Sequence, residues 1–335
     1  MKITGFGDYL IHFSPIGNER FLQAETMHMS FTGAEANVCA ALALWGEDVS
    51  FVTRLPHHPL AEKSVMFMRS FGASTKHIRY GGKRMGLYFL ENGASVRPSK
   101  VIYDRMDSAF TEATPSDFDI DAILSDTDVL FLTGITPALS ENLFDCTLAL
   151  CKEASLRHKA VVYDVNFRPT LGSAADAEKN LRALAPYITT LVGNEEHLKT
   201  LLRVSTPHGE DHRRERLSDI TEKTRDQLHI PEIAVTVRRT LSASDAITYA
   251  AFSNGKEPLA LSAEYHLHVV DRVGSGDAFS SGLLYAKCHG YSAEDAVRFA
   301  AASGAIKHTI HNDINFASIE EIMHLLESTS VDVTR

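Results

Sequence analysis

The sequence predicts an α/β protein with a central, mostly parallel β-sheet flanked by helices on both faces. Short apolar runs typical of buried strands recur along the chain, and helical patterns separate most of them. Two further stretches, 6–31 and 80–103, contain short strand patterns with Gly-rich turns, which suit a small β lid. We therefore expect one domain over residues 1–330, with the lid formed by about 8–33 and 79–111.

The elements follow one another in a strand–helix order. After a first strand-like run, residues 34–45 form a helix-like stretch of small apolar residues that ends at Gly46. Later apolar runs that indicate core strands cover residues 49–55, 129–135, 160–167, 189–194 and 233–238. Because parallel strands end at a common edge, we expect one rim to carry Asp164, Asn166, Arg168, Asn194 and Arg238. The charged segment 203–227 is interpreted as a solvated helix and loop.

Composition and charge exclude several classes of function. The 335 residues are 44% hydrophobic and 23% charged, which is typical of a folded globular protein. The formal net charge of −10 and the lack of a dense basic run argue against nucleic acid as a partner. No apolar run approaches the roughly 18 residues of a membrane span, so no membrane partner is expected. An anionic substrate would need a few locally placed arginines.

The cysteines indicate a reducing compartment. Cys39, Cys146, Cys151 and Cys288 are scattered without a CxxC pair or a metal-ligand spacing. The N-terminal run contains Gly5, Gly7 and Asp8 and does not have the apolar core of a signal peptide. We expect a cytoplasmic protein with reduced thiols.

The most informative segment is DRVGSGDAFSSGLLYAKCHG, residues 271–290. A strand-like approach meets Gly274, Ser275 and Gly276, and a helix is expected to open at Asp277 and to end near Gly290. Unpaired amides at a helix N-terminus bind anions. From these residues alone, Asp277 suits either a helix cap or a general base.

Two common nucleotide motifs are absent from this segment. A GxGxxG fingerprint would need glycine where Phe279 stands, and the chain has no GxxxxGK[ST] loop. A dinucleotide site or a P-loop is therefore disfavoured.

The segment DRVGSGDAF resembles the C-terminal signature of the ribokinase-like, PfkB-type carbohydrate kinases, whose usual form is D-x-x-G-A-G-D. Residues 32–46, TGAEANVCAALALWG, are similar to that family's Gly-Gly-x-x-x-Asn-x-A segment, and residues 194–202, NEEHLKTLL, to its Asn-x-x-Glu segment. The resemblance extends from the first strand to about Leu326. It implies a ribokinase-like fold and an ATP-dependent sugar kinase whose catalytic set is Gly274, Ser275, Gly276 and Asp277, with Asp277 as the base.

Within that family the chain is most similar to the 2-keto-3-deoxygluconate kinases. The likeness is carried by residues 85–109 (MGLYFLENGASVRPSKVIYDRMDSA), 132–140 (LTGITPALS) and 164–172 (DVNFRPTLG). It implies phosphorylation of a sugar acid, 2-keto-3-deoxygluconate, to its 6-phosphate. The residues it assigns to the sugar acid are Gly33, Asn37, Tyr88, Tyr103, Arg105, Arg168 and Asp313.

The same resemblance implies ATP and Mg²⁺ as cofactors and leaves a monovalent cation open. For the nucleotide it points to Asn194, Thr236 and Arg238, and for the metal to Glu196, with Glu195 as the alternative, acting through water. The chain departs from the family at three places. Thr32 and Ala34 flank Gly33 where a glycine pair is usual, His197 stands at the fourth position of Asn-x-x-Glu, and residues 236–245 (TVRRTLSASD) replace a glycine-rich ATP loop.

Other interpretations stay open at this point. The chain could phosphorylate a neutral sugar such as fructose or ribose, or be a non-catalytic sugar-binding relative, although the intact 274–277 set favours catalysis. Exposed lid strands are compatible with a homodimer through the lid. The sequence HGEDH at 208–212 has two histidines at i and i+4, but its charged surroundings favour a solvated loop over a zinc site.

Overall fold

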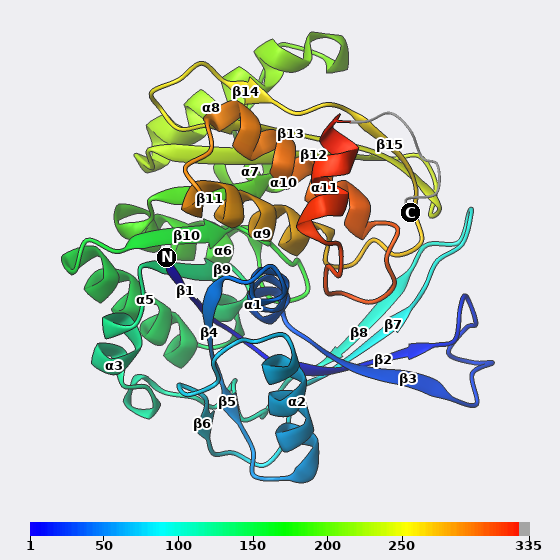
Figure 1. Cartoon of the computed structure of the whole chain (residues 1–335), viewed down its shortest axis with the longest axis vertical. Coiled ribbons are helices and arrows are strands. Elements are labelled where there is room, and N and C mark those ends of the chain that lie inside the picture. Colours follow the sequence, from blue (N-terminus) through cyan, green and yellow to red (C-terminus); the bar gives the residue numbers. More distant parts are fainter. Residues whose placement is uncertain (328–335) are drawn as a thin grey trace.

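The computed structural model describes residues 1–327 and confirms the predicted fold class (Figure 1). Residues 328–330 of the predicted domain lie outside the described residues. The large sheet consists of β1 (Lys2–Phe6), β4 (Asp48–Val52), β9 (Val129–Thr133), β10 (Ala160–Asp164), β11 (Thr190–Asn194), β12 (Glu232–Thr240), β13 (Asp245–Ser253), β14 (Ala260–Leu261) and β15 (Tyr265–His268). Their order is β14-β13-β12-β11-β10-β9-β1-β4, and β15 also pairs with β13. The six strands from β12 to β4 are parallel, and β13 to β15 add an antiparallel edge.

Helices cover both faces of this sheet, each over its own apolar core (Figure 1). One face carries α1 (Ala34–Leu44), α9 (Ser275–Cys288), α10 (Ala293–Lys307) and α11 (Ile319–Glu327). The other carries α3 (Ile120–Ser125), α4 (Thr136–Leu139), α5 (Glu141–Leu156), α6 (Ala174–Leu184), α7 (Glu195–Leu202) and α8 (Arg213–Leu228). Side chains of β9 alternate between the two cores, with Phe131 on the α1 side and Leu130 and Leu132 on the α5 side.

Smaller elements complete the chain. Helix α2 extends the core on the α1 side, and β5 pairs in parallel with β6. The bounds of these elements and of three short 3₁₀ helices are α2 (Pro59–Ser70), β5 (Arg54–Leu55), β6 (Arg79–Tyr80), η1 (Pro115–Asp117), η2 (Ala185–Tyr187) and η3 (Glu210–His212). Within α8, Leu217 and Ile220 are fully buried, so the predicted solvated helix also has a packed face.

A separate four-stranded sheet forms the lid. Its strands β2 (Leu10–Pro15), β3 (Met27–Thr32), β7 (Leu87–Glu91) and β8 (Lys100–Asp104) are ordered β3-β2-β7-β8 and project away from the large sheet (Figure 1). All four strands lie inside the two ranges predicted for the lid. The first strand-like run is divided at Gly7 and Asp8, because its first half pairs in the large sheet and its second half in the lid.

The tip of the lid touches the turn between β12 and β13. The amide of Ala243 donates to the Ser95 carbonyl oxygen at 2.7 Å, and the amide of Ser95 donates to Ser244 Oγ at 2.9 Å. Arg272 donates to the carbonyl oxygens of Ser242 and Ala243 in the same turn. The tip of the lid therefore contacts residues 243 and 244, which belong to the segment 236–245.

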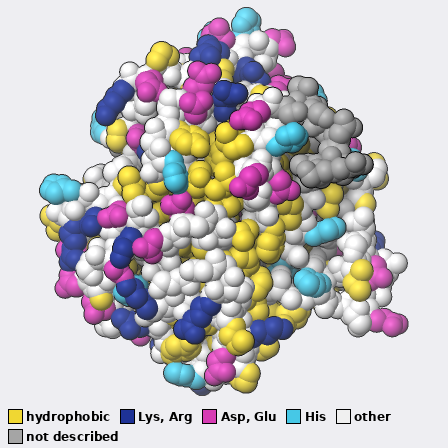
Figure 2. All heavy atoms as spheres, in the orientation of Figure 1, with side chains coloured by type: hydrophobic (Ala, Val, Ile, Leu, Met, Phe, Trp, Pro, Cys, Tyr) yellow, Lys and Arg dark blue, Asp and Glu magenta, His cyan; other side chains and the backbone are white. Residues whose placement is uncertain are grey.

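Charged side chains of both signs are interspersed on the face drawn in Figure 2. This agrees with the absence of a dense basic run in the sequence. Among residues 1–327, no helix has the length and apolar character needed to cross a membrane.

Candidate active site

The predicted anion site lies where the 271–274 turn enters α9. The helix begins at Ser275, two residues before the expected start, so the amides of Ser275, Gly276 and Asp277 belong to its unpaired first turn. Gly274 is the N-cap with φ +78, and a Cβ there would overlap the carbonyl oxygen of Asp313. A Cβ on Gly276 would meet nothing within 4 Å, which leaves open space in front of these amides.

Asp277 is held by a side chain from a distant helix. Asn37 Nδ2 on α1 donates to Asp277 Oδ2 at 2.8 Å. Burial raises the pKa of Asp277 to about 7; the bond from Asn37 and the charge of Arg168 lower it, whereas Asp164 and Asp313 raise it. Because Gly274 is the cap and Asp277 makes its described hydrogen bond to Asn37, this geometry favours the general-base interpretation over the helix-cap one.

The turn around Gly33 explains why Asn37 is in reach. A Cβ at Gly33 would overlap the backbone oxygen of Asp8, so glycine permits the close approach of α1 to the start of the lid. Thr32, one of the departures from the family pattern, has a local function: its Oγ1 donates to Asn37 Oδ1 at 3.3 Å. That bond orients the amide so that its nitrogen faces Asp277.

Glu35 anchors the same end of α1 and was not singled out by the sequence. Its Oε1 accepts hydrogen bonds from Thr133 N at 3.1 Å, Thr133 Oγ1 at 2.8 Å and Thr136 Oγ1 at 2.9 Å. Burial raises the pKa of Glu35 to about 7. The hydrogen bonds to its carboxyl group act in the opposite direction but do not cancel the effect of burial. A Cβ at Gly7 would overlap this carboxyl group, so Gly7 is required for the packing.

Three residues assigned to the sugar acid form a stack on the lid. The rings of Tyr88 and Tyr103 are stacked with centroids 5.1 Å apart, and the Arg105 guanidinium lies 4.1 Å from the Tyr103 centroid. Arg105 Nη1 is 3.8 Å from Asp8 Oδ2, and both side chains are buried. Neither Arg105 Nε nor Asp8 Oδ2 has a hydrogen-bond partner in the described part of the chain. Buried polar atoms without partners are typical of a site that receives a polar ligand.

His12 and Asp313 extend this polar surface toward Gly274. His12 Nδ1 lies 3.5 Å from Asp313 Oδ1, and the His12 and Tyr88 rings are 4.6 Å apart. Burial lowers the pKa of His12, although Asp313 and Asp271 act in the opposite direction. Sequence reasoning did not identify Asp8 or His12 as site residues, because neither belongs to a motif quoted for the family.

Arg168 lies in the loop after β10. Burial raises the pKa of Asp164 to about 6, and its carboxyl group accepts hydrogen bonds from Asn166 N and Ser280 Oγ. The Arg168 charge lowers the pKa of Asp164, of Asp277 and of Tyr88. Arg168 therefore changes the pKa of the expected base, Asp277, and of Tyr88 on the lid, although these residues come from separate parts of the chain.

The residues predicted for the nucleotide lie on neighbouring strands. Asn194 on β11 is in register with Thr236 on β12, and the Asn194 side chain caps α7 by accepting from the Glu196 amide at 2.9 Å. Burial, and then the charges of Arg272 and Arg168, lower the pKa of Arg238. Two guanidinium groups from other parts of the chain thus act on Arg238, an arrangement that suits a polyanion such as a triphosphate.

The residue predicted for the metal points outward. The Glu196 side chain is 74% exposed and lies 3.3 Å from Lys199 Nζ. Glu195 is buried in ion pairs with Lys199 and Arg216. Burial, and then Arg168 and Arg238, lower the pKa of His197 to about 4, so it is a neutral side chain at neutral pH. Within residues 1–327 no group of three or more His, Cys, Asp or Glu side chains could hold a metal ion.

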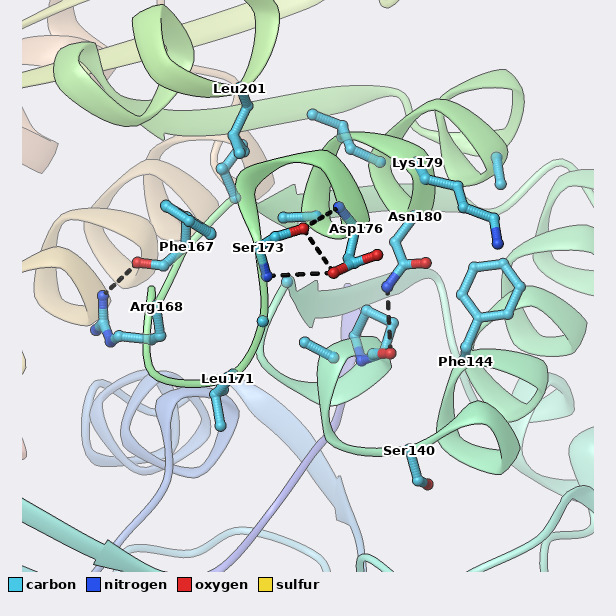
Figure 3. A pocket seen from close by; sticks show the side chains of 18 of the residues that line it. Ser140, Phe144, Phe167, Arg168, Leu171, Ser173, Asp176, Lys179, Asn180 and Leu201 are labelled. Carbon is cyan, nitrogen blue, oxygen red and sulfur yellow. Dashed lines mark hydrogen bonds between the residues drawn. The ribbon is translucent and has the colours of Figure 1, made fainter.

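A cavity of about 540 Å³ adjoins the Arg168 loop (Figure 3). It lies among α4, α5 and α6, and its lining includes Phe144, Phe167 and Leu171. Arg168 lines its edge and donates to the Phe167 carbonyl oxygen, as Figure 3 shows, but Asp277 does not line it. The expected base therefore does not line this cavity, although Arg168 does.

Comparisons with known proteins agree with this geometry. A 2-dehydro-3-deoxygalactonokinase of Haloferax volcanii is 29% identical over 335 residues, which span 100% of this chain and 99% of that protein. A 2-dehydro-3-deoxygluconokinase of Bacillus subtilis is 24% identical over 298 residues, spanning 88% and 85%. The crystal structure of a 2-dehydro-3-deoxygluconokinase from Thermotoga maritima superimposes with a TM-score of 0.94 at 36% identity, covering 98% of each chain. The family described as pfkB family carbohydrate kinase matches residues 2–320. The chain belongs to the pfkB family of carbohydrate kinases.

Proposed function

We propose that this chain transfers the γ-phosphate of ATP to a hydroxyl group of a sugar acid, 2-keto-3-deoxygluconate, to give its 6-phosphate. The observation that carries the proposal is the position of Asp277. Its carboxyl group has a pKa near 7, stands beside the unpaired first-turn amides of α9, and is under the electrostatic influence of Arg168.

In this mechanism Asp277 accepts the proton of the attacking hydroxyl. The amides of Ser275, Gly276 and Asp277 stabilise the charge that develops on the transferred phosphoryl group. Asn37 holds the carboxylate in one orientation through its 2.8 Å hydrogen bond. The closed lid excludes water, which would otherwise compete with the sugar as nucleophile.

The arginines support an acidic substrate. Arg105 and Tyr103 lie on the lid, and Arg168 lies on the loop after β10, so two cationic groups border the same interior in a chain with a net charge of −10. A neutral sugar would need only hydrogen-bonding groups, whereas a carboxylate gains from charge-assisted bonds to a guanidinium. Gly33, Tyr88 and Asp313 complete the proposed sugar-acid contacts.

The nucleotide would be bound between β11 and β12. Asn194, Thr236 and Arg238 would contact its phosphates, and Mg²⁺ would offset the phosphate charge there. The outward position of Glu196 supports at most a water-mediated role for that residue. The expected cytoplasmic location belongs to the same proposal, since three of the four free cysteines are buried thiols.

The decisive experiment is a phosphorylation assay over a substrate panel. The panel contains 2-keto-3-deoxygluconate, 2-keto-3-deoxygalactonate, fructose and ribose, each with ATP and Mg²⁺. We expect kcat/KM for the sugar acids to exceed that for the neutral sugars by at least about a hundredfold. Equal values for fructose would replace the sugar-acid proposal with a neutral-sugar kinase, and no turnover on any member would favour a non-catalytic relative.

The 4-epimer, 2-keto-3-deoxygalactonate, is a second candidate substrate. The relative from Haloferax volcanii, which matches the chain over its full length, carries the name of a kinase for that compound. The panel separates the two, since a higher kcat/KM for the galacto compound would assign it as the preferred substrate.

The lid also supports a homodimer. Its edge strand β8 exposes Val101 and Ile102, which are 44% and 53% exposed, and β3 at the other edge exposes Met27. A second copy of the chain could cover these apolar side chains. Light scattering after size-exclusion chromatography should give twice the 36.9 kDa chain mass, and Ile102→Glu should return the monomer. A monomeric parent protein would refute the dimer.

A further inference from the structure

A fully buried lysine lies beneath the anion-binding turn. Lys307 is 0% exposed at the last residue of α10, and its Nζ donates to the carbonyl oxygen of Ile310 at 3.0 Å. A buried ammonium group is costly unless opposite charges or hydrogen bonds compensate for lost water. Burial lowers the pKa of Lys307, while the carboxylates of Asp271, Asp313 and Asp277 act in the opposite direction.

Two loops that support Gly274 meet around this lysine. The amides of Val270 and Asp271 donate to the carbonyl oxygen of His308, the residue after Lys307. In return, the Asp271 carboxylate accepts from Val273 N at 3.0 Å and from Asn312 N at 3.1 Å. Gly274 itself packs against the Asp313 carbonyl group. The 270–274 and 308–313 loops thus form one hydrogen-bonded unit.

The charges in this unit would be unfavourable without a cation. Asp271 and Asp313 are buried, Asp313 raises the pKa of both Asp271 and Asp277, and Asp271 raises the pKa of His12. A triphosphate arriving at the first-turn amides would add further negative charge. Burial raises the pKa of Asp271, and the charge of Lys307 acts against this shift, which favours the ionised carboxylate that accepts hydrogen bonds from both loops.

These residues do not fit an exchangeable monovalent cation serving the turn. Such an ion needs several carboxylate or carbonyl oxygens that replace its hydration shell. In the unit formed by the two loops, the Asp271 oxygens are occupied by backbone amides, and the Ile310 carbonyl oxygen accepts from Lys307. In this unit the ammonium group of Lys307 supplies the positive charge that a bound monovalent ion would otherwise supply.

We propose that Lys307 is a built-in cation that positions the anion-binding turn and makes phosphoryl transfer independent of monovalent metal ions. It is a positioning residue, since it acts through Asp271 and the Gly274 turn and not on the substrate itself. The inference rests on the proposed kinase function. It adds that the reaction needs no monovalent metal ion.

The first test uses the unaltered protein. Initial rates are measured with Mg²⁺ in a buffer whose only other cation is tetramethylammonium, and KCl or NaCl then replaces tetramethylammonium chloride at constant ionic strength. We expect less than about a twofold change in kcat. Activation of tenfold or more by K⁺ or Na⁺ would overturn the proposal without any variant.

The second test removes the charge. In the alkali-free buffer, Lys307→Met should lower kcat by about a hundredfold, the scale of a lost electrostatic contact in the transition state. K⁺ or ammonium should raise the kcat of Lys307→Met at least about tenfold, whereas tetramethylammonium should leave it unchanged. Lys287→Met, which removes the half-buried lysine paired with Glu232 at the other end of α9, serves as the control and should stay cation-independent. Full activity of Lys307→Met would refute the role.

A third measurement guards against a merely structural defect. If Lys307 acts by offsetting Asp271, the double variant Lys307→Met/Asp271→Asn should be more active and melt at a higher temperature than Lys307→Met. Additive losses in both quantities would contradict the charge-offset role. All rates are taken with the panel sugar that gives the highest turnover, so a wrong substrate assignment and a wrong role for Lys307 give different results.

Discussion

Asn37 Nδ2 donates to Asp277 Oδ2 at 2.8 Å and so joins two residues that are 240 positions apart in the chain. This bond lowers the pKa of Asp277, which burial raises to about 7. The catalytic state requires the ionised carboxylate, so activity should fall as the pH drops below about 7. Asn37→Ala removes the hydrogen bond that lowers the pKa of Asp277. We predict that the acid limb of kcat/KM against pH moves to higher pH in this variant, whereas it stays in place in Asn180→Ala, whose side chain lines the cavity among α4, α5 and α6. An unshifted limb in Asn37→Ala would exclude Asp277 as the titrating base.

Asp277→Asn should lower kcat by at least about a hundredfold, because the amide cannot accept the hydroxyl proton. The ATP dissociation constant, measured by calorimetry, should change little, since the backbone amides of the first turn of α9 stay in place. Near-parental turnover would remove Asp277 from the mechanism.

The two glycines of the motif should respond differently to alanine. Gly274 has φ +78 and packs against the Asp313 carbonyl group, so Gly274→Ala should lower the melting temperature as well as the activity. Gly276 has free space where a Cβ would stand, so Gly276→Ala should keep the parental melting temperature. It should instead weaken ATP binding or turnover, because its methyl group would occupy the space before the amides. Parental kinetics in Gly276→Ala would show that the phosphate binds elsewhere.

Arg105→Met and Arg168→Met should each raise the KM for the sugar acid roughly ten- to a hundredfold, the equivalent of one charge-assisted contact of about 1.5–3 kcal/mol. The KM for ATP should change little in Arg105→Met, because Arg105 lies on the lid beside Tyr103. Arg182→Met, which removes a surface ion pair with Glu178, is the control for loss of an arginine. Equal losses on the sugar acid and on fructose would show that neither arginine recognises the carboxylate.

Glu35 should make the stability of the protein depend on pH. Its pKa rises from 4.5 to about 7 on folding, because its carboxyl group is buried. Between these two values the unfolded state loses the proton while the folded state keeps it, so the free energy of unfolding should fall as the pH rises through this window. The decline attributable to this group is about 3 kcal/mol. Glu35→Gln should remove it, as measured by urea unfolding at pH 5 and pH 8, and an identical decline in both proteins would contradict the assignment.

The sequence predicted the sheet, the lid and a helix opening at Asp277, which begins at Ser275 in the structure. Each of these depends on local patterns: apolar runs, Gly-rich turns and a glycine-flanked helix start. It also grouped Asp164, Arg168 and Arg238 at one rim, since parallel strands end together. Asp8, His12 and Glu35 could not be found in this way. Their functions depend on long-range packing, such as the approach of Glu35 to Thr133 across 98 positions, and no local pattern distinguishes them from other polar residues.

Glu196 also shows that a local motif does not determine how a side chain lies in the folded protein. Its place in the motif suggested an acidic role near Mg²⁺ through water, but the motif does not give the direction of the side chain, which depends on its neighbours. Here Arg216 and Lys199 hold Glu195 inside, which leaves Glu196 facing solvent.

The hydrogen bonds of Ser95 with Ala243 and Ser244 connect the lid, which carries residues proposed to bind the sugar, to the turn after β12, the strand that carries residues proposed to bind the nucleotide. The lid cannot swing open without releasing the β12–β13 turn, which adjoins the strand proposed to bind the nucleotide. Departure of the phosphorylated sugar and of ADP should therefore be kinetically linked, with one opening event serving both. If this opening is slower than phosphoryl transfer, kcat should rise when the Ser95 contacts at the tip of the lid are weakened.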